Sequence, residues 1–251
     1  MNNTKITGNK GAKMGLQTMD TATVRILADG FLARDLTFEN TAGPEMEQAV
    51  ALSNIGDHTA FYRCRFLGYQ DTLNPHTGTQ FYRDCEIYGT VDFIFGKAKV
   101  VFQNCHIYAR KPLPGQSNTI TAQGRETPFA DSGTVMQNCS FSGTPDLLQD
   151  LNVKTFLGRP WKNHSTTVIM QSSLDKLIDP RGWLEWEGVS LDKVYNAEYN
   201  NRGPGAITNQ RVKWSRVITS RAEAEKFTVR NFIDGENWIG YTGIPYYADL
   251  L

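Results

Sequence analysis

The sequence predicts an all-β solenoid, a parallel β-helix in which each turn of the chain stacks on the preceding one. The main observation is a sequence motif that occurs twice. Phe61-Tyr62-Arg63-Cys64 is followed by Asp71, and Phe81-Tyr82-Arg83-Asp84-Cys85 is followed by Asp92, each aspartate seven residues after the cysteine. The offset is 21 residues, both at the cysteines (85 − 64) and at the aspartates (92 − 71). Short β-rich units at this kind of period are typical of solenoids. The second observation is that only residues 221–227 have a convincing helical pattern.

A length of 251 residues suits one large domain, since all-β folds of this size commonly stay single. Hydrophobic residues make up 40% of the chain, which is enough for a core. Lysine and arginine total 26, as do aspartate and glutamate, so the charge favours neither nucleic acid nor an anionic membrane as a partner. No apolar run reaches the length of a membrane span, and residues 1–10 are too polar for a signal peptide.

The predicted elements are short strands separated by turn residues, followed by one helix. Apart from the two copies of the repeat, strands are expected at 24–27, 31–33, 36–38, 48–52, 100–105, 119–122, 134–141, 156–161 and 167–171. Gly43-Pro44 marks a turn between two of them. Ser220 suits the N-cap of the helix at 221–227, which we expect to cover the C-terminal end of the solenoid.

The spacing of the four cysteines matches the predicted coils of the solenoid and is not a metal-binding or disulfide-rich pattern. Cys64, Cys85, Cys105 and Cys139 are separated by 21, 20 and 34 residues, and none forms a Cys-x-x-Cys pair. We expect Cys64 and Cys85 to belong to a ladder of small buried side chains, which suits the burial habit of cysteine. Cys105 and Cys139 could form a disulfide if the chain is secreted.

The two aspartates of the repeat are candidate catalytic residues. Equivalent residues of adjacent coils stack about 4.8 Å apart, so Asp71 and Asp92 would be neighbouring carboxylates. Two carboxylates this close do not both ionise easily, so one should keep a proton at neutral pH while the other is anionic. Turn residues or solvated coil positions are the alternative. Each aspartate, however, lies in a strand-like run, where an unpaired carboxylate would be costly.

Amide and cationic side chains are expected beside this pair. Gln70 precedes Asp71, and Gln48 lies about one coil back. Arg159 comes from a later coil and could clamp a carboxylate through two hydrogen bonds, although a surface salt bridge is the alternative. Trp161 has the same strand parity as Arg159, so the two side chains should share an outward face. An exposed tryptophan there suits stacking on a sugar.

Other common catalytic signatures are absent from the sequence. It contains no Gly-x-Ser-x-Gly, no His-Glu-x-x-His and no phosphate-binding glycine-rich loop. The histidines are scattered, and we expect surface or coil positions for all four of them: His58, His76, His106 and His164.

Five longer motifs resemble the motif series of plant-type pectin methylesterases. They are Gly30–Pro44, Gln48–Leu52, Tyr69–Leu73, Gly89–Gly96 and Leu157–Trp161. The resemblance extends from about Lys5 to the C-terminus, in order and at family-like spacing, and motifs of this length are highly specific. It implies a right-handed parallel β-helix that hydrolyses methyl esters of galacturonan without a cofactor.

The resemblance also implies a role for each candidate. By position, Asp92 would be the nucleophile, and Asp71 would be the general acid and then the general base. Gln48 and Gln70 would donate hydrogen bonds to the oxyanion of the tetrahedral intermediate. Arg159 would hold Asp92.

Substrate contacts, a disulfide and partners follow from the same resemblance. Trp161, Phe93 and Trp183 would contact the sugar chain, and Cys105 and Cys139 would form a disulfide. The substrate would be methyl-esterified homogalacturonan, and a proteinaceous pectinesterase inhibitor would be a further partner. The chain would be a monomeric, secreted protein of the cell wall.

Two departures from the family pattern bear on this hypothesis. Asn74-Pro75 follows Leu73 where the family usually has an aromatic residue, so loss of a substrate contact is expected. Family members also usually begin several strands earlier, so the catalytic domain assigned to 1–251 is expected to lack its first coils. We therefore expect an open edge at the coil of 24–27, with lower stability and weaker action on polymer.

Two other classes of function fit parts of the pattern. Retaining glycosidases also use carboxylates about 5 Å apart, but the amides of Gln48 and Gln70 suit an oxyanion better than an oxocarbenium ion. The Asp and Gly-His-Gly pattern of polygalacturonases and the calcium-binding carboxylate cluster of pectate lyases are not evident. The second alternative is a truncated, inactive homologue that only binds polyuronide or an inhibitor protein.

Overall fold

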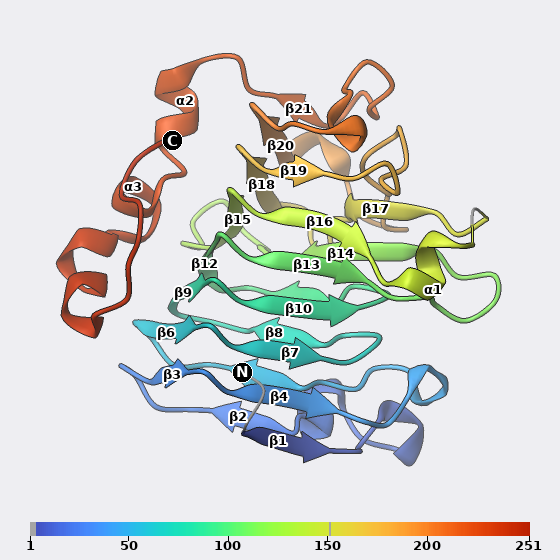
Figure 1. Ribbon diagram of the computed structural model, residues 1–251. Helices are drawn as coiled ribbons and strands as arrows, with labels where there is room; N and C mark the ends of the chain where they lie inside the picture. Colours follow the sequence, from blue (N-terminus) through green and yellow to red (C-terminus); the bar gives the residue numbers. More distant parts are fainter. Residues whose placement is uncertain (1–3, 151) are drawn as a thin grey trace.

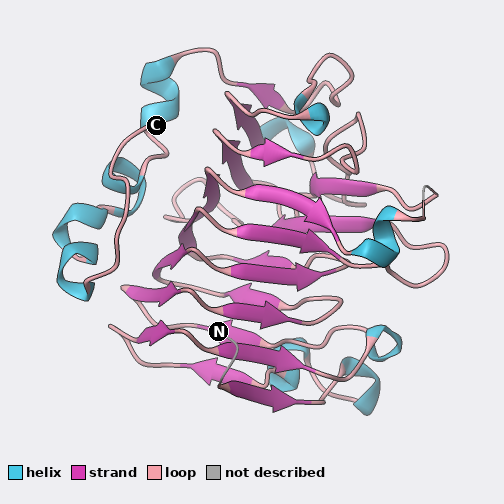
Figure 2. Cartoon of the chain, in the orientation of Figure 1, coloured by secondary structure: helices cyan, strands magenta, loops and turns pink. Residues whose placement is uncertain are grey.

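The computed structural model describes residues 4–150 and 152–251 and confirms a right-handed parallel β-helix (Figure 1). Strands account for most of the regular structure, and the helices are short (Figure 2). The strands form three parallel sheets that run along the solenoid, because successive strands of each coil enter different sheets. Among the described residues, no helix is both long enough and apolar enough to cross a membrane.

The three sheets are named by their first strands. The β1 sheet contains β1 (Lys5–Gly8), β4 (Thr37–Asn40), β7 (Arg65–Leu67), β10 (Glu86–Gly89), β13 (His106–Ala109), β16 (Ser140–Gly143) and β19 (Ser173–Leu174). The β2 sheet contains β2 (Val24–Ile26), β5 (Leu52–Asn54), β8 (Leu73–Pro75), β11 (Ile94–Gly96), β14 (Asn118–Gln123) and β17 (Thr155–Gly158). The β3 sheet contains β3 (Leu32–Arg34), β6 (Thr59–Tyr62), β9 (Thr79–Arg83), β12 (Lys99–Gln103), β15 (Gly133–Gln137), β18 (Thr166–Met170), β20 (Tyr195–Tyr199) and β21 (Arg216–Val217).

The helices lie in the connections and in the C-terminal segment. The α-helices are α1 (Pro145–Leu148), α2 (Arg221–Glu225) and α3 (Val229–Ile233). The 3₁₀-helices are η1 (Ala12–Met14), η2 (Thr18–Thr21), η3 (Pro44–Met46), η4 (Leu191–Lys193), η5 (Pro204–Ala206), η6 (Gly235–Asn237) and η7 (Ile239–Thr242). The predicted N-cap of α2 is confirmed, since the Ser220 hydroxyl accepts a hydrogen bond from the backbone N–H of Glu223.

The strand register confirms the predicted offset of 21 residues. In the β1 sheet Arg65 pairs with Glu86 (86 − 65), and in the β2 sheet Leu73 pairs with Ile94 (94 − 73). Equivalent residues of these coils therefore lie side by side on neighbouring strands, which is the property that brings the candidate site together.

Aromatic rings form the centre of the core. Phe61, Tyr82 and Phe102 are fully buried and stack coil on coil, with ring centroids 4.7 and 4.6 Å apart. Each such pair contributes about 0.5–1.5 kcal/mol beyond the burial of its apolar area. The stack thus helps to fix the spacing of the coils that carry the two aspartates.

The cysteines form the predicted buried ladder, with Cys64, Cys85, Cys105 and Cys139 each at most 1% exposed. The predicted disulfide is contradicted, because Cys105 and Cys139 are free thiols in this structure. Each of the two thiols instead lies 3.5 Å from a backbone carbonyl oxygen of the preceding coil, to which it donates a hydrogen bond.

The C-terminal segment does not cover the end of the solenoid, which corrects that prediction. After β21 the chain turns back, and α2, α3 and the following residues run along the outside of the β3 sheet (Figure 1). The outer face of this sheet carries apolar side chains, such as Val101 and Val135, that pack against the segment. Burying that apolar face is favourable, and this explains the position of the segment.

Candidate active site

Asp71 and Asp92 lie in adjacent coils, at the turns that lead into β8 and β11. Their φ values of 61° and 49° are left-handed, which corrects the prediction that each lies within a strand. Other turns of the solenoid place non-glycine residues in the same conformation, so the conformation belongs to these turns and does not by itself mark a site. What distinguishes the two aspartates is the surface that they share.

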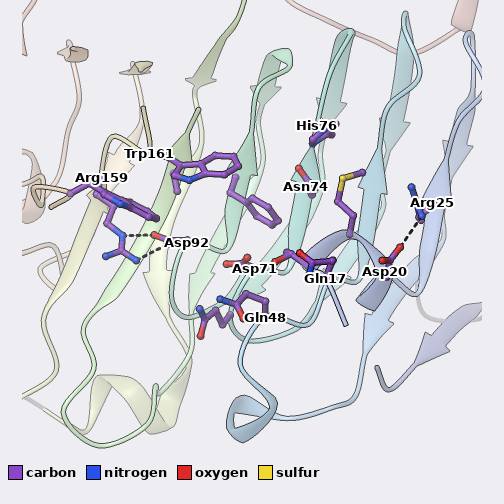
Figure 3. A pocket seen from close by; sticks show the side chains of 16 residues that line it. Gln17, Asp20, Arg25, Gln48, Asp71, Asn74, His76, Asp92, Arg159 and Trp161 are labelled. Carbon is purple, nitrogen blue, oxygen red and sulfur yellow. Dashed lines mark hydrogen bonds and ion pairs between the residues drawn. The ribbon is translucent and has the colours of Figure 1, made fainter. Parts of the chain in front are cut away.

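Both carboxylates line one cleft of about 710 Å³ over the β2 sheet (Figure 3). Asp71 is 8% exposed and Asp92 is 6% exposed, so both are largely shielded from water. The other residues that line the cleft are Gln17, Thr18, Met19, Asp20, Arg25, Gln48, Gln70, Asn74, His76, Phe95, Ala122, Arg159, Trp161 and Trp186. A cleft of this size is within the usual range for ligand sites.

Asp92 is held from two sides. Arg159 donates from Nε to Oδ1 at 2.8 Å and from Nη2 to Oδ2 at 2.6 Å, which is the predicted two-bond clamp (Figure 3). The Thr119 hydroxyl donates to Oδ1 at 2.6 Å and accepts from the backbone N–H of Asp92 at 2.9 Å. Both carboxylate oxygens act as acceptors toward a cation, which is the arrangement of an ionised carboxylate. The clamp also fixes the orientation of the group.

Asp71 has the opposite electrostatic environment. Burial raises the pKa of its carboxyl group well above the usual value, and the charge of Asp92 raises this pKa further. The charge of Arg159 opposes this rise only in part. The raised pKa favours the protonated form of Asp71, whereas the carboxylate of Asp92 is paired with a cation, so the two groups have unlike environments.

Two amide side chains face the same cleft. Gln48 and Gln70 are half-buried and line the cleft. Gln48 lies near Asp71 (Figure 3). Within the described part of the chain, neither amide group has a side-chain hydrogen-bond partner, so their N–H groups are available to a ligand. Gln48 lies in the connection before β5 and not in a strand, since β5 begins at Leu52 and the strand predicted at 48–52 is displaced.

The structure contradicts two of the predicted substrate contacts. Phe93 is 0% exposed and Trp183 is 1% exposed, and both pack in the main core. Phe93 directly follows Asp92 in the chain, but its side chain packs in the core of the solenoid, whereas that of Asp92 lines the cleft. Trp161 does line the cleft, as predicted.

Several residues of the site were not predicted, and three of them contact Asp92, Arg159 or Trp161. Trp186 lies under the Arg159 guanidinium, with Cζ 4.1 Å from the ring centroid, and Phe95 meets Trp161 edge to face at 6.4 Å. Thr119 is the third. Thr119 and Phe95 lie in strand-like motifs, so the sequence placed them near the site without indicating their contacts. Trp186 lies in a loop that has no repeat, so no sequence pattern distinguished it from Trp183.

His76 occupies a coil position directly after β8, as predicted, and it also lines the cleft. Among residues 4–150 and 152–251, no group of three or more His, Cys, Asp or Glu side chains could hold a metal ion. The absence of a cofactor from the reaction stays a prediction.

Comparison with known proteins agrees with the motif series. The pectinesterase family model matches residues 1–236. The chain is 52% identical over 251 residues to Pectinesterase 2 of Citrus sinensis, an alignment that covers 98% of this chain and 49% of the relative. It is 51% identical over 254 residues to Probable pectinesterase/pectinesterase inhibitor 25 of Arabidopsis thaliana, which covers 100% of this chain and 41% of the relative.

Among solved structures, pectin methylesterase from carrot matches with a TM-score of 0.97 at 49% sequence identity, over 98% of this chain and 79% of that chain. The chain spans less than half the length of the two curated relatives above. The family match nevertheless includes every residue of the cleft described above. This chain therefore belongs to the pectinesterase family.

Proposed function

We propose that this chain is a pectinesterase, a carboxylic ester hydrolase that converts methyl-esterified homogalacturonan into pectate and methanol. The observation that carries the proposal is the pair of unlike carboxylates, Asp92 clamped by Arg159 and Asp71 buried beside it with a raised pKa. The cleft around them also holds two amides without partners among the described residues. Similarity in sequence and fold to pectinesterases supports the same reaction.

In the first step an oxygen of Asp92 attacks the carbonyl carbon of the ester and forms a tetrahedral intermediate with a negatively charged oxygen. The amides of Gln48 and Gln70 donate hydrogen bonds to this oxygen. The intermediate collapses by breaking the bond to the methoxy group, which takes the proton of Asp71 and leaves as methanol. The uronate is then an acyl anhydride on Asp92, and Asp71 is ionised.

In the second step the Asp71 carboxylate removes a proton from water, whose oxygen attacks the carbonyl carbon of the anhydride. Breaking the bond to Asp92 releases that carboxylate, which Arg159 binds again. Asp71 has regained its proton, and the product leaves as a free uronic acid that ionises in water. Ester and water have become acid and methanol, and both aspartates are back in their starting states.

The arrangement favours an esterase over a glycosidase. Hydrolysis of a glycoside passes through an oxocarbenium-like transition state, which negative groups stabilise. The groups beside Asp71 are instead two amides, which are hydrogen-bond donors suited to an oxyanion.

Methanol release from methyl-esterified pectin tests the proposal. Asp92→Asn removes the nucleophile and should lower methanol release by roughly 10³-fold or more. Asp84→Asn is the matched control, because Asp84 also occupies a left-handed turn, with φ 52°, but does not line the cleft. This control should release methanol at the wild-type rate.

The products distinguish the alternatives. A wild-type chain that binds galacturonan without releasing methanol would support the inactive, polyuronide-binding homologue. New reducing ends would indicate a glycosidase, and unsaturated ends would indicate a lyase. Normal methanol release by Asp92→Asn, with its fold checked by circular dichroism, would contradict the mechanism.

The remaining assignments rest on similarity alone. Relatives named as pectinesterase/pectinesterase inhibitor suggest that an inhibitor protein is a partner. We further infer that residues 1–251 act as one catalytic domain, that the chain is a monomer, and that it is a secreted protein of the cell wall.

A further inference from the structure

The sequence contains the acceptor pattern for N-linked glycosylation, Asn-x-Ser/Thr with x other than proline, at three places. They are Asn2-Asn3-Thr4, Asn138-Cys139-Ser140 and Asn163-His164-Ser165. The first of them begins outside the described residues. In a folded protein a glycan also needs an exposed amide with space beside it, because the group is bulky. The structure gives the other two triplets opposite environments.

The triplet at Asn138 is built into the wall of the solenoid. Asn138 has a left-handed φ of 53°, donates from Nδ2 to Oδ1 of Asn104 at 2.8 Å and accepts from Nη2 of Arg202 at 3.3 Å. The Ser140 hydroxyl lies 2.7 Å from Nδ1 of His106. Both polar side chains of this triplet therefore contribute to the fold, and a sugar on Nδ2 would lie against Asn104 and Arg202.

The triplet at Asn163 lies in an exposed turn between Trp161 and β18. The backbone N–H of Ser165 donates to the carbonyl oxygen of Lys162 at 3.0 Å, which closes a β-turn with Asn163 and His164 at its centre. The Asn163 side chain is exposed. A group attached to it would therefore displace no part of the core.

The side-chain amide of Asn163 is anchored through its oxygen. Oδ1 accepts a hydrogen bond from the backbone N–H of Ser190 at 3.1 Å, whereas Nδ2 makes no hydrogen bond within the described part of the chain. N-linked glycosylation uses Nδ2 and leaves Oδ1 unchanged. The bond from Ser190 would thus be kept, and it would fix the direction in which the first sugar leaves the turn.

A recess of about 410 Å³ adjoins this amide. Residues that line it include Glu126, Trp161, Lys162, Asn163, Trp186 and Glu187. Indole rings, carboxylates and an ammonium group together suit a sugar, because the rings can pack on its apolar face and the charged groups can bond to its hydroxyls. The exposed loop 187–189, next to Ser190 in the chain, also lines this recess.

The hydroxyl of Ser165 is an independent indication. This side chain is fully buried, and its Oγ has no hydrogen-bond partner among the residues that the structure describes. A buried hydroxyl without a partner destabilises the folded state, so alanine would suit the fold better at this position. The hydroxyl has a use before folding, since it is the group that makes the triplet an acceptor.

We propose that Asn163 carries an N-linked glycan whose first sugar lies in the recess, and that Asn138 is not modified. The donor is a lipid-linked diphospho-oligosaccharide of the secretory pathway. A bond forms between Nδ2 and C1 of the first sugar, the bond from C1 to the phosphate oxygen breaks, the lipid diphosphate leaves, and the amide loses one proton. This assignment rests on the proposed secretion of the chain and not on its esterase activity.

Mapping of each site in the secreted protein tests the assignment. A cleavable signal sequence directs the whole chain into the secretory pathway of cultured plant cells. A peptide N-glycosidase acting in heavy-oxygen water then converts each glycosylated asparagine into a labelled aspartate. Peptide mass spectrometry should find label at Asn163 and none at Asn138, and the triplet at Asn2 is read on its own peptide. Ser165→Ala should abolish the label at Asn163, whereas Ser140→Ala is the matched control and should keep it.

The same Ser165→Ala variant tests the position of the sugar, because it keeps the Asn163 amide and its bond from Ser190. In protein from plant cells, backbone amide exchange at 187–190 should be slower in the wild type than in this variant. The two should exchange alike when they are made in bacteria, which add no glycan. The bacterial variant should also melt at the temperature of the bacterial wild type or above it, since it loses a buried hydroxyl that has no partner.

The outcomes separate the site from the position of the sugar. An unlabelled Asn163 in the secreted wild type would overturn the site, as would label at Asn138 in its place. Label at Asn163 with equal exchange at 187–190 in both plant-made proteins would overturn the placement in the recess. Methanol release enters none of these measurements, so a failure of the proposed esterase activity would leave their results unchanged.

Discussion

At the scale of single residues, the position of Asp92 depends on a hydroxyl group from 27 residues further along the chain. Thr119 is 1% exposed and donates to Oδ1 of Asp92, while Arg159 takes both carboxylate oxygens. In the proposed mechanism Thr119 is therefore a positioning residue, which acts on the reaction through Asp92.

Replacing this hydroxyl should affect turnover more than binding. Thr119→Val removes a hydrogen bond to a charged group, which is worth about 1.5–3 kcal/mol, so kcat should fall by roughly 10- to 100-fold with little change in KM. Thr119→Ser keeps the hydroxyl and should recover most of the loss. Equal kcat values for the valine and serine variants would show that packing, and not the hydrogen bond, is what matters.

The pKa of Asp71 makes a second prediction at this scale. The pKa of Asp71 is higher in the folded protein than in the unfolded chain. The free energy of unfolding therefore decreases as the pH rises from the pKa of the unfolded state to that of the folded state. Asp71→Asn removes this cost. Its melting temperature should exceed that of the wild type by a margin that grows from about pH 4 upward, by roughly 2–4 °C for each kcal/mol recovered.

Thermal melts between pH 4 and pH 8 measure this margin. Asp92→Asn is the informative comparison, because it leaves the Arg159 guanidinium without its acceptor and should lower the melting temperature. A margin for Asp71→Asn that shrinks with rising pH would contradict the raised pKa.

At the scale of elements, the C-terminal tail, residues 247–251, is held by hydrogen bonds from side-chain amides and not by pairing with the backbone of a strand. Nε2 atoms of three stacked glutamines donate to alternate carbonyl oxygens of the tail, at 2.9, 2.9 and 2.6 Å, in the pairs Gln103–Tyr247, Gln137–Asp249 and Gln171–Leu251. The amides also bond to one another along the solenoid, at 2.8 and 3.0 Å. The middle glutamine therefore serves both networks.

Gln137→Leu should release the tail without disturbing the cleft. It leaves several buried polar groups unpaired, at a cost of about 1–3 kcal/mol each, so the melting temperature should fall by several degrees. Amide exchange at 247–251 should become faster, while methanol release at low temperature should stay near the wild-type rate. Gln210→Leu, at an exposed position, is the control. Unchanged exchange at 247–251 would show that the apolar contacts alone hold the tail.

At the scale of the whole molecule, the cysteine ladder reports on the integrity of successive coils. Cys64, Cys85, Cys105 and Cys139 are buried free thiols, each at most 1% exposed, so an alkylating reagent cannot reach them in the folded protein. In the native protein we expect no alkylation on the timescale in which the unfolded protein reacts completely. Mass spectrometry without reduction should then find all four thiols after unfolding. Protection of Cys105 and Cys139 alone in the unfolded, unreduced protein would restore the disulfide that the structure contradicts.

The sequence by itself determined the solenoid and the central pair of the site. A fixed offset of 21 residues places equivalent positions of adjacent coils side by side. The proximity of Asp71 and Asp92 could therefore be predicted from their residue numbers. The two glutamines followed in the same way, since each lies beside an aspartate or one coil away. The clamp by Arg159 was also predicted, because its motif resembles that of a known family and a guanidinium suits a carboxylate.

Only the tertiary structure decided which side chains reach the cleft. Connections of unequal length follow β13, β16 and β17. The offset of 21 residues does not continue there, so the number of residues between two positions no longer indicates whether they are close in space. That is why Trp183 was chosen although Trp186 lines the cleft, and why the contact of Thr119 was missed. Phe93 was wrong for a different reason: its assignment rested on the family resemblance alone, whereas the side chain next to Asp92 in the chain packs into the core. Repetition fixes register along the coils, whereas the facing of a side chain in a turn or loop depends on backbone torsions and packing that no repeat encodes.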